Sequence, residues 1–216
     1  MSKTKKTFKI LGGVVLSIFI FLCCVLIFFN VTHEYHNVSG QSMYPTLNAQ
    51  GVDSDAVFVS KIKKCKRGDV IVAKSQNADA QGNDYIVVKR LIALGGDKVC
   101  IKAFEGNIRI FIIKNGQDQA ELLEEPYLAN YNVNNGLDTR FYKMATNFSL
   151  EVDLEGFVTI PLNTIFYLGD NRINSYDCSA ENYGPVNKDL LVGKVDYIIT
   201  GKEWAYFQVL KQILGA

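Results

Sequence analysis

A serine and a lysine, Ser42 and Lys89, are the residues of this sequence whose types could carry out chemistry together. Ser42 lies in the segment GQSMYP (residues 40–45), shortly after an apolar N-terminal run. A serine hydroxyl becomes a strong nucleophile when a base removes its proton, and a lysine amine can be that base only where apolar surroundings lower its pKa. Lys89 lies in the largely apolar segment YIVVKRLI (residues 85–92). The pair predicts acyl transfer by a Ser/Lys mechanism.

Strand periodicity leaves the environment of Lys89 open. Alternate residues of a strand point to opposite faces, so Lys89 shares one face with Val87 and Leu91, and Arg90 lies on the other. In one arrangement the strand is at an edge and the Lys89 amine reaches water. In the other the amine is buried, and desolvation lowers its pKa, which would let it accept the Ser42 proton near neutral pH.

The residues around Ser42 suggest a constrained turn. Gly40 can adopt a positive φ angle. Pro45 fixes its own φ and favours an extended conformation at the residue before it. Taken alone, however, a serine close to a proline is usually an ordinary turn residue. The functional interpretation therefore depends on what accompanies Ser42 elsewhere in the chain.

A charge-free N-terminal run predicts a membrane anchor. Lysines cluster in residues 1–9, and no charged residue occurs in residues 10–32. As a helix this run would be about 34 Å long, and the hydrocarbon core of a bilayer is about 30 Å thick. The run is longer than a signal-peptide core and has no A-x-A-like cleavage site. We therefore expect residues 1–9 in the cytoplasm, 10–32 across the bilayer and 33–216 on the outer side.

Beyond the anchor the chain is predicted to be mainly β, with long loops and little helix. Apolar runs bounded by glycine and polar turns are typical of strands. They occur at residues 56–59, 69–73, 84–94, 98–102, 108–113, 157–160, 165–168 and 191–200. A hairpin turn signal, KNG, ends the run at 108–113. The polar, Asn-rich segment 130–147 predicts a surface excursion within a variable region at 103–157, and 204–214 forms a weakly amphipathic tail.

Composition gives no support for nucleic-acid or metal binding. The net charge is +1, so no bulk electrostatic attraction to nucleic acid is expected. Outside the apolar run the cysteines are Cys65, Cys100 and Cys178, which lack metal-like spacing. The two histidines, His33 and His36, are both close to the membrane boundary. We expect no metal site, no organic cofactor and no disulfide.

A third polar segment completes a pattern. It reads GDNRINSYD (residues 169–177) and follows the predicted strand 165–168, a place where functional groups commonly collect. With the SMYPT segment at Ser42 and the VKR strand at Lys89, which is followed by GD at 96–97, it resembles the bacterial type I signal peptidases. These are Ser/Lys serine proteases of the cytoplasmic membrane. The motifs occur in the family's order after an N-terminal anchor, and the resemblance covers nearly the whole chain.

The resemblance implies a signal-peptidase-type antiparallel β catalytic domain and a role for each motif residue. Ser42 would be the nucleophile, its backbone N–H would hold the oxyanion, and Lys89 would be the general base. Ser175 would hydrogen-bond the lysine amine and orient it. Gly169 would let the polar turn pack close to the base. The residues expected to brace this turn through ionic contacts are Asp170, Arg172 and Asp177.

By the same resemblance the substrates would be preproteins carrying signal peptides. The export signal would lie extended beside the strand that carries Lys89 and add a strand to the sheet. Cleavage would follow a small-x-small motif whose side chains enter shallow apolar pockets. The residues expected to form the pocket walls are Val38, Met43, Leu47, Val87 and Val88. The expected partners are preproteins and the lipid bilayer.

Two departures from the family pattern and two alternatives remain, and the first departure is ALGGD at residues 93–97 where the family has G-L-P-G-D. The family's last motif usually reads D-S-R, but here Asp177 is followed by Cys178 and Ser179, so Asp177 is expected to lose an arginine partner. That second departure motivates one alternative, a signal-peptidase-like assembly factor for exported surface or pilus proteins with little or no catalysis. A Ser-His-Asp enzyme would be the other, with His33 or His36 as its base.

Overall fold

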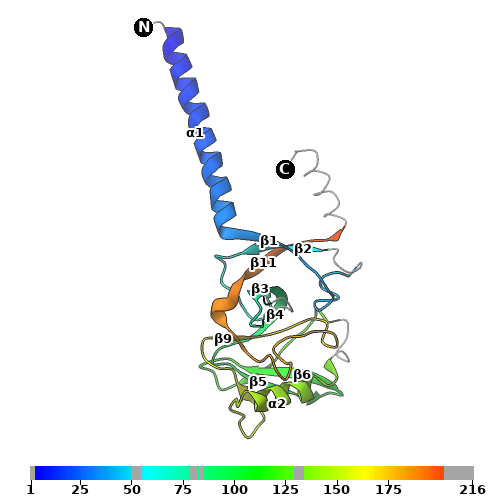
Figure 1. The fold of residues 1–216 in the computed structure, drawn as a ribbon. Helices are drawn as coiled ribbons and strands as arrows, with labels where there is room; N and C mark the ends of the chain where they lie inside the picture. The colour runs from blue at the N-terminus through cyan, green and yellow to red at the C-terminus, as the bar shows by residue number, and fades with distance from the viewer. Residues whose placement is uncertain (1–2, 50–54, 78–81, 83–84, 129–133, 202–216) are drawn as a thin grey trace.

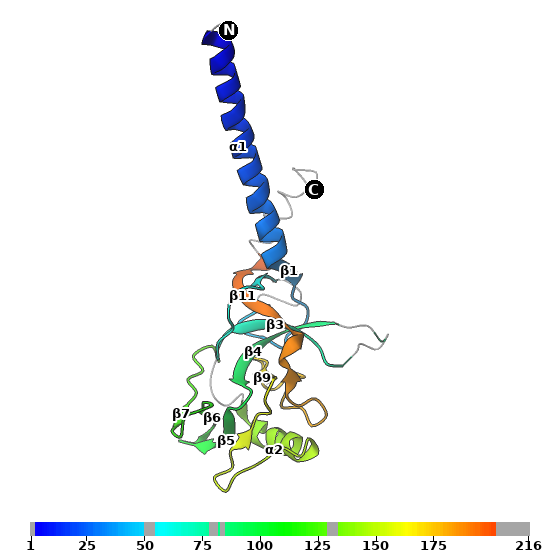
Figure 2. The ribbon, with the colours of Figure 1, turned by 90° about the vertical axis from the view of Figure 1, so that its left-hand side faces the viewer.

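A long N-terminal helix stands apart from a β-rich body in the computed structural model, which describes residues 3–49, 55–77, 82, 85–128 and 134–201 (Figures 1 and 2). The helix, α1, covers Lys3–Thr32, and its part Ile10–Thr32 is long and apolar enough to cross a membrane. Large apolar side chains along this part are exposed. Such exposure is expected of a helix whose surroundings are lipid, because in water it would be costly.

The larger sheet has seven antiparallel strands in the order β1-β2-β11-β3-β4-β9-β10. These strands are β1 (His33–Asn37), β2 (Ala56–Ser60), β11 (Leu191–Ile199), β3 (Val70–Lys74), β4 (Ile86–Leu94), β9 (Thr164–Leu168) and β10 (Val186–Asn187). A 3-10 turn, η2 (Lys188–Leu190), leads from β10 into β11. Because β1 begins directly after α1, the edge of this sheet lies at the foot of the helix (Figure 1).

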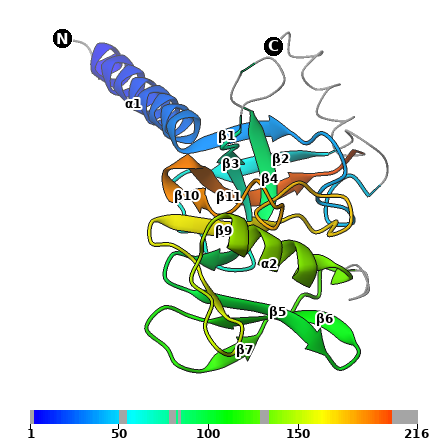
Figure 3. The ribbon, with the colours of Figure 1, turned by 60° about the horizontal axis from the view of Figure 1, so that its bottom comes forward.

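A smaller sheet lies at the end of the body that is farthest from α1 (Figures 1 and 2). Its order is β7-β6-β5-β8, formed by β7 (Ala120–Leu122), β6 (Asn107–Ile113), β5 (Lys98–Phe104) and β8 (Val158–Thr159). Helix α2 (Leu137–Asn147) packs beside β5 (Figure 3). One apolar core joins this sheet, α2 and the middle of the larger sheet, and a second, smaller core is formed by residues of β2, β3, β11 and the segment 38–47.

The mainly antiparallel β architecture predicted from the sequence is confirmed, and each of the eight predicted apolar runs contains a strand. The expectation of little helix and a surface excursion at 130–147 was wrong for 137–147. There Leu137, Phe141, Met144 and Ala145 are buried on one face of α2. Their spacing of four, three and one is helical, but the many polar residues around them hid it. The predicted tail 204–214 lies outside the described residues.

The order of the strands in the larger sheet decides between the two environments considered for Lys89. β4 is an inner strand that pairs with β3 on one side and β9 on the other, so Lys89 is not on an edge strand. In these pairings Lys89 is opposite Ile71, and Arg90 is opposite both Val70 and Leu168. The two adjacent cations therefore point to opposite faces of a largely buried sheet.

Candidate active site

Ser42 and Lys89 meet in the folded chain. A hydrogen bond joins the Lys89 Nζ atom to the Ser42 Oγ atom, which are 2.5 Å apart. Lys89 is only 5% exposed although it carries an amine at the end of a long side chain. Ser42 and Lys89 are 47 positions apart in the sequence. They meet because the turn that carries Ser42 lies over β4, the strand that carries Lys89.

Burial sets the proton affinity of this amine. Desolvation lowers the pKa of Lys89 below its ordinary value, and the negative charges of Asp177 and Asp170 partly oppose that effect. The net direction is downward because the ammonium form has lost its water. A lysine with a lowered pKa that contacts a hydroxyl oxygen has the chemistry of a general base beside its nucleophile.

A pair of polar side chains holds the turn that carries Ser42. Asn48 Nδ2 donates to the carbonyl oxygens of Gly40 and Val38, at 2.7 and 3.2 Å. Asn48 and Asp55 each accept a hydrogen bond from the other's backbone N–H. Gly40 has a φ angle of 76°, which is the left-handed conformation that glycine tolerates. The chain therefore bends sharply just before Ser42, and Asn48 fixes the bend.

The polar segment 169–177 packs directly against Ser42. The Asn171 N–H donates to the Ser42 carbonyl oxygen at 3.0 Å. A Cβ atom on Gly169 would overlap both that oxygen and the Ser175 hydroxyl. Only glycine therefore allows this approach. The Ser175 Oγ atom is buried and makes no hydrogen bond to any residue in the described part of the chain, so its role in orienting Lys89 stays a prediction.

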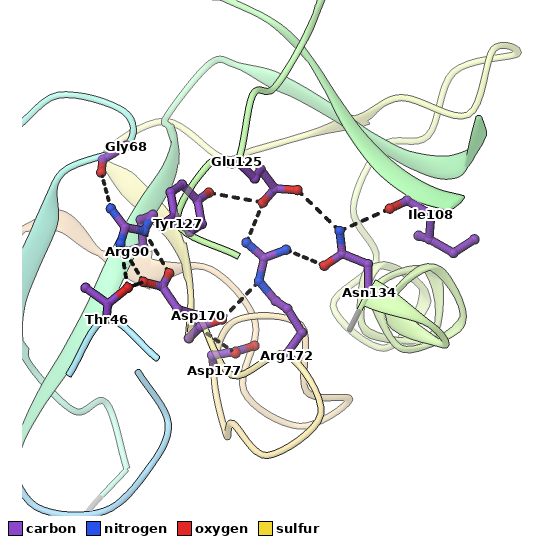
Figure 4. A network of polar contacts seen from close by, with 11 residues as sticks. Thr46, Gly68, Arg90, Ile108, Glu125, Tyr127, Asn134, Asp170, Arg172 and Asp177 are labelled. Atoms are coloured by element: carbon purple, nitrogen blue, oxygen red, sulfur yellow. Dashed lines mark hydrogen bonds and ion pairs between the residues drawn. The ribbon is translucent and has the colours of Figure 1, made fainter. Parts of the chain in front are cut away.

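Arg90 provides the ionic partner for Asp170 (Figure 4). The Arg90 guanidinium donates two hydrogen bonds to the Asp170 carboxylate, at 2.7 and 2.5 Å, and a third to the Gly68 carbonyl oxygen. The Thr46 hydroxyl donates to the same carboxylate. Asp170 thus links the start of the polar segment to β4 and to the turn after Ser42.

Arg172 is held by a different carboxylate, from the region of the smaller sheet. Its guanidinium pairs with Glu125 at 2.5 Å and donates to Asn134 at 2.6 Å, and the side chains of Arg172 and Glu125 are fully buried. The Arg172 Nε–H donates to the Gly169 carbonyl oxygen at 3.0 Å. Tyr127 connects this pair to the previous one, because its hydroxyl donates to Glu125 and its ring stacks on Arg90 (Figure 4).

Asp177 has hydrogen-bond partners although the arginine usual in the family is missing. Its carboxylate accepts hydrogen bonds from the Gly169 N–H at 2.9 Å and from the Ser179 hydroxyl and N–H at 2.7 and 3.1 Å. Ser179 therefore replaces an ionic partner with a neutral one. The expected loss of an arginine partner is therefore seen, and the ionic contact expected of Asp177 is replaced by hydrogen bonds from neutral donors.

A groove of about 520 Å³ runs past Ser42 and Lys89. One wall comes from residues 36–42 and the other from residues 85–89, with Asn174 and Tyr176 beside them. Of the predicted pocket residues, Val38, Val87 and Val88 line the groove. Met43 and Leu47 do not, because they are buried in the smaller core.

Comparison with known proteins gives one consistent answer. A family model described as "Signal peptidase, peptidase S26" matches residues 11–200. "Signal peptidase I" of Bacillus caldolyticus is 32% identical over 183 residues, which cover 83% of this chain and 86% of the relative. "Signal peptidase I U" of Bacillus subtilis is also 32% identical, over 88% of this chain and 87% of the relative.

The chain belongs to the signal peptidase family, peptidase S26. A crystal structure of a signal peptidase I from Enterococcus faecalis is 23% identical, with a TM-score of 0.37 over 62% of this chain and 98% of the other.

In this signal peptidase family chain the two histidines have local partners. The His33 ring stacks on Phe58 and shares a 2.8 Å hydrogen bond with Thr32. His36 bonds Glu34 at 3.1 Å. Within the described contacts, neither imidazole bonds Ser42, whose hydroxyl is joined to Lys89. In the described part of the chain, Cys65, Cys100 and Cys178 are not joined by disulfides.

Sequence reasoning missed the residues that support the signal peptidase site from a distance. Glu125, Tyr127 and Asn134 lie in the region that was predicted to be a variable excursion. No spacing or periodicity marks them, because their importance arises from tertiary contacts with Arg172 and Arg90. Asn48 left a weak signal, since asparagine is one of the few residues that readily take its φ of 57°.

Proposed function

We propose that this chain is a membrane-bound signal peptidase that cleaves signal peptides from exported preproteins after a small-x-small motif, with Ser42 as nucleophile and Lys89 as general base. The observation that carries the proposal is the 2.5 Å contact between the Ser42 hydroxyl and a buried amine whose pKa burial lowers. A module that only bound exported proteins would gain nothing from burying an amine beside a hydroxyl, because that burial is costly.

The proposed reaction proceeds by acyl transfer. Neutral Lys89 accepts the Ser42 proton as the oxygen attacks the scissile carbonyl, and the Ser42 N–H stabilises the resulting oxyanion. The ammonium of Lys89 then gives the proton to the departing amine as the peptide C–N bond breaks. Water, deprotonated by Lys89, attacks the ester and releases the signal peptide with a free carboxylate. Lys89 returns its proton to Ser42, so each cycle consumes one water and one peptide bond.

Strand pairing supports a place for the substrate. β3 pairs with β4 from Ile86 to Arg90, but β9 pairs with β4 only from Arg90 onward. On the β9 side, residues 86–89 have no strand partner within the described part of the chain. An extended peptide could add there as a short strand, which is a common mode of peptide recognition. Its side chains would then reach the groove where Val38, Val87 and Val88 lie.

The proposed placement puts α1 across the cytoplasmic membrane, with residues 1–9 inside the cell and the β body outside. The lysines before the apolar run favour this orientation, because cytoplasmic flanks are enriched in lysine and arginine. The reactive pair would then face the side on which exported preproteins emerge. The short chain between α1 and Ser42 would keep the site near the membrane surface.

The test is cleavage of a model preprotein by the full chain in detergent. We expect a cut after a small-x-small motif, and its loss in Ser42→Ala and in Lys89→Met. Lys98→Met is the matched control, because Lys98 is also a strand lysine but pairs with Asp153 at the surface of the smaller sheet. Thermal unfolding of each variant establishes that it is folded.

Three outcomes would contradict the proposal. Substantial cleavage by folded Lys89→Met would exclude Lys89 as the base. Loss of cleavage in His36→Ala, with cleavage kept in Lys89→Met, would favour the Ser-His-Asp alternative. Binding of the preprotein by the unmodified chain without any cut would favour the assembly factor.

A further inference from the structure

A strongly basic loop follows β2, outside the active-site groove. Residues 61–67 read KIKKCKR, so five of these seven residues are cations. Arg67 is committed to the buried carboxylate of Asp97, with hydrogen bonds of 2.7 and 2.6 Å. The other four cations, all lysines, are exposed. The mechanism proposed above uses none of them.

The loop begins at the end of the candidate membrane span. The Lys61 N–H donates to the carbonyl oxygen of Thr32, the last residue of that span, at 2.9 Å. The polar headgroup layer adds about 5–8 Å to each side of the hydrocarbon core. A segment bonded to the last residue of the span therefore lies at the depth of the phospholipid headgroups.

The side chains of the loop suit that depth. Ile62 is 62% exposed between lysines on either side, which is an unfavourable place in water for a large apolar side chain. At a membrane surface the apolar side chain enters the acyl boundary while lysine stems extend toward phosphates. The Lys-Ile-Lys-Lys order thus presents both kinds of contact to a bilayer.

A separate groove of about 480 Å³ opens beside this loop. Lys61, Lys63, Lys64 and Lys188 line it together with apolar residues such as Leu162 and Val192.

The acidic groups that face these lysines balance only part of their charge. Glu34 pairs with Lys61 at 3.0 Å, and Asp196 pairs with Lys63 at 2.8 Å. Among the residues that the structure describes, no ion pair involves Lys64 or Lys188. The groove therefore keeps an excess of positive charge.

We propose that this loop and groove form a binding site for the headgroup of an anionic phospholipid in the bilayer that α1 spans. The site rests on the proposed membrane placement and is independent of the catalytic pair. Lysines bind phosphate as point charges, and each basic residue near an anionic surface adds to the attraction. A bound headgroup would fix the orientation of the β body on the membrane, in addition to the tether through α1.

The test uses the full chain in an uncharged detergent, titrated with dihexanoyl phosphatidylglycerol, dihexanoyl phosphatidylcholine or sn-glycerol 3-phosphate. We expect saturable binding of the phosphatidylglycerol alone. The variant Lys63→Gln/Lys64→Gln should bind about 30-fold more weakly, given the usual contribution of each lysine near an anionic surface. The control Lys114→Gln/Lys143→Gln removes the same charge and also breaks exposed ion pairs, but in the region of the smaller sheet. It should bind as the unmodified chain does.

Several results would overturn the proposal. Equal binding of the two lipids, or equal loss in both double variants, would show that no specific headgroup site exists. Binding of sn-glycerol 3-phosphate as tight as that of the lipid would indicate a site for soluble phosphate instead. An acidic peptide that binds more tightly than the lipid would indicate a protein partner.

A depth measurement gives an independent readout. The chain has one tryptophan, Trp204. In a Trp204→Phe background, Ile62→Trp should be quenched by brominated phosphatidylglycerol in vesicles, and absence of quenching would place the loop away from the bilayer. The lipid site and the catalytic proposal can fail separately. Ser42→Ala should still bind the lipid, and Lys63→Gln/Lys64→Gln should still cleave a soluble peptide.

Discussion

The buried pair between Glu125 and Arg172 offers the sharpest test of how the polar segment 169–177 is held. The two side chains are fully buried, and Arg172 also donates to the carbonyl oxygen of Gly169, the residue that packs against Ser42. The substitution Glu125→Gln keeps the size of the side chain but removes its charge. It leaves the Arg172 guanidinium buried without a compensating carboxylate.

Glu125→Gln should cause a large loss of folding stability, although it only replaces a carboxylate with an amide. Removing one partner of a buried ion pair costs about 3–5 kcal/mol, because the remaining charge is uncompensated. Domains are typically stable by about 5–15 kcal/mol, so much of the total would be lost. For a domain of this size the midpoint of thermal unfolding should fall by about 6–20 °C. The rate of cleavage should fall as well, because Arg172 positions Gly169 against Ser42.

Glu124→Gln is the matched control, because Glu124 precedes Glu125 in the chain but is 75% exposed and lies 3.8 Å from Arg109. It should cost less than about 1 kcal/mol, the usual range for an exposed pair. Thermal unfolding of the full chain in detergent, with kcat and KM for a peptide substrate, measures both effects. The double variant Glu125→Gln/Arg172→Met should recover part of the stability, since no buried charge is left unpaired. The reasoning is refuted if Glu125→Gln is no worse than Glu124→Gln, or if the double variant shows the full sum of two losses.

Three further predictions concern the reactive pair and its neighbours. Burial lowers the pKa of Lys89 in the folded chain below its value of 10.5 in the unfolded chain, so between these two pKa values the unfolded state binds more protons and stability rises with pH. Lys89→Met should therefore stabilise the protein at pH 7, with a gain that shrinks toward pH 10.5; denaturant titrations at several pH values check this, and a constant gain would contradict it. Gly169→Ala should abolish cleavage, because its methyl group would overlap Ser175 and the Ser42 carbonyl oxygen; a normal kcat would show that the loop can shift. Ser175→Ala should leave the unfolding midpoint nearly unchanged, because its buried hydroxyl has no hydrogen bond to lose within the described residues. A lowered kcat in that variant would support its predicted orienting role, and an unchanged one would exclude it.

The sequence was most informative where local pattern and tertiary structure agree. The strands follow from apolar runs between turns, and the motif order was enough to pair Ser42 with Lys89. The sequence alone could not show whether Lys89 was buried, because burial depends on β4 being an inner strand of the sheet. α2 was missed since polar residues surround its four buried positions. Glu125 was missed for another reason, as a buried carboxylate looks like a surface residue until its arginine partner is placed beside it.

The carboxylates near Ser42 and Lys89 oppose the effect of burial on the pKa of Lys89 only in part. Negative charge near the amine favours its protonated form, and Asp177 is the strongest such influence, with Asp170 also contributing. Each of these carboxylates has other donors: Asp170 is neutralised by Arg90, and Asp177 accepts hydrogen bonds from Gly169 and from Ser179. The aspartates can therefore brace the polar segment while desolvation still dominates at Lys89. Ser179 meets this requirement without adding a charge, because its hydroxyl and N–H donate to the Asp177 carboxylate where the family usually has an arginine.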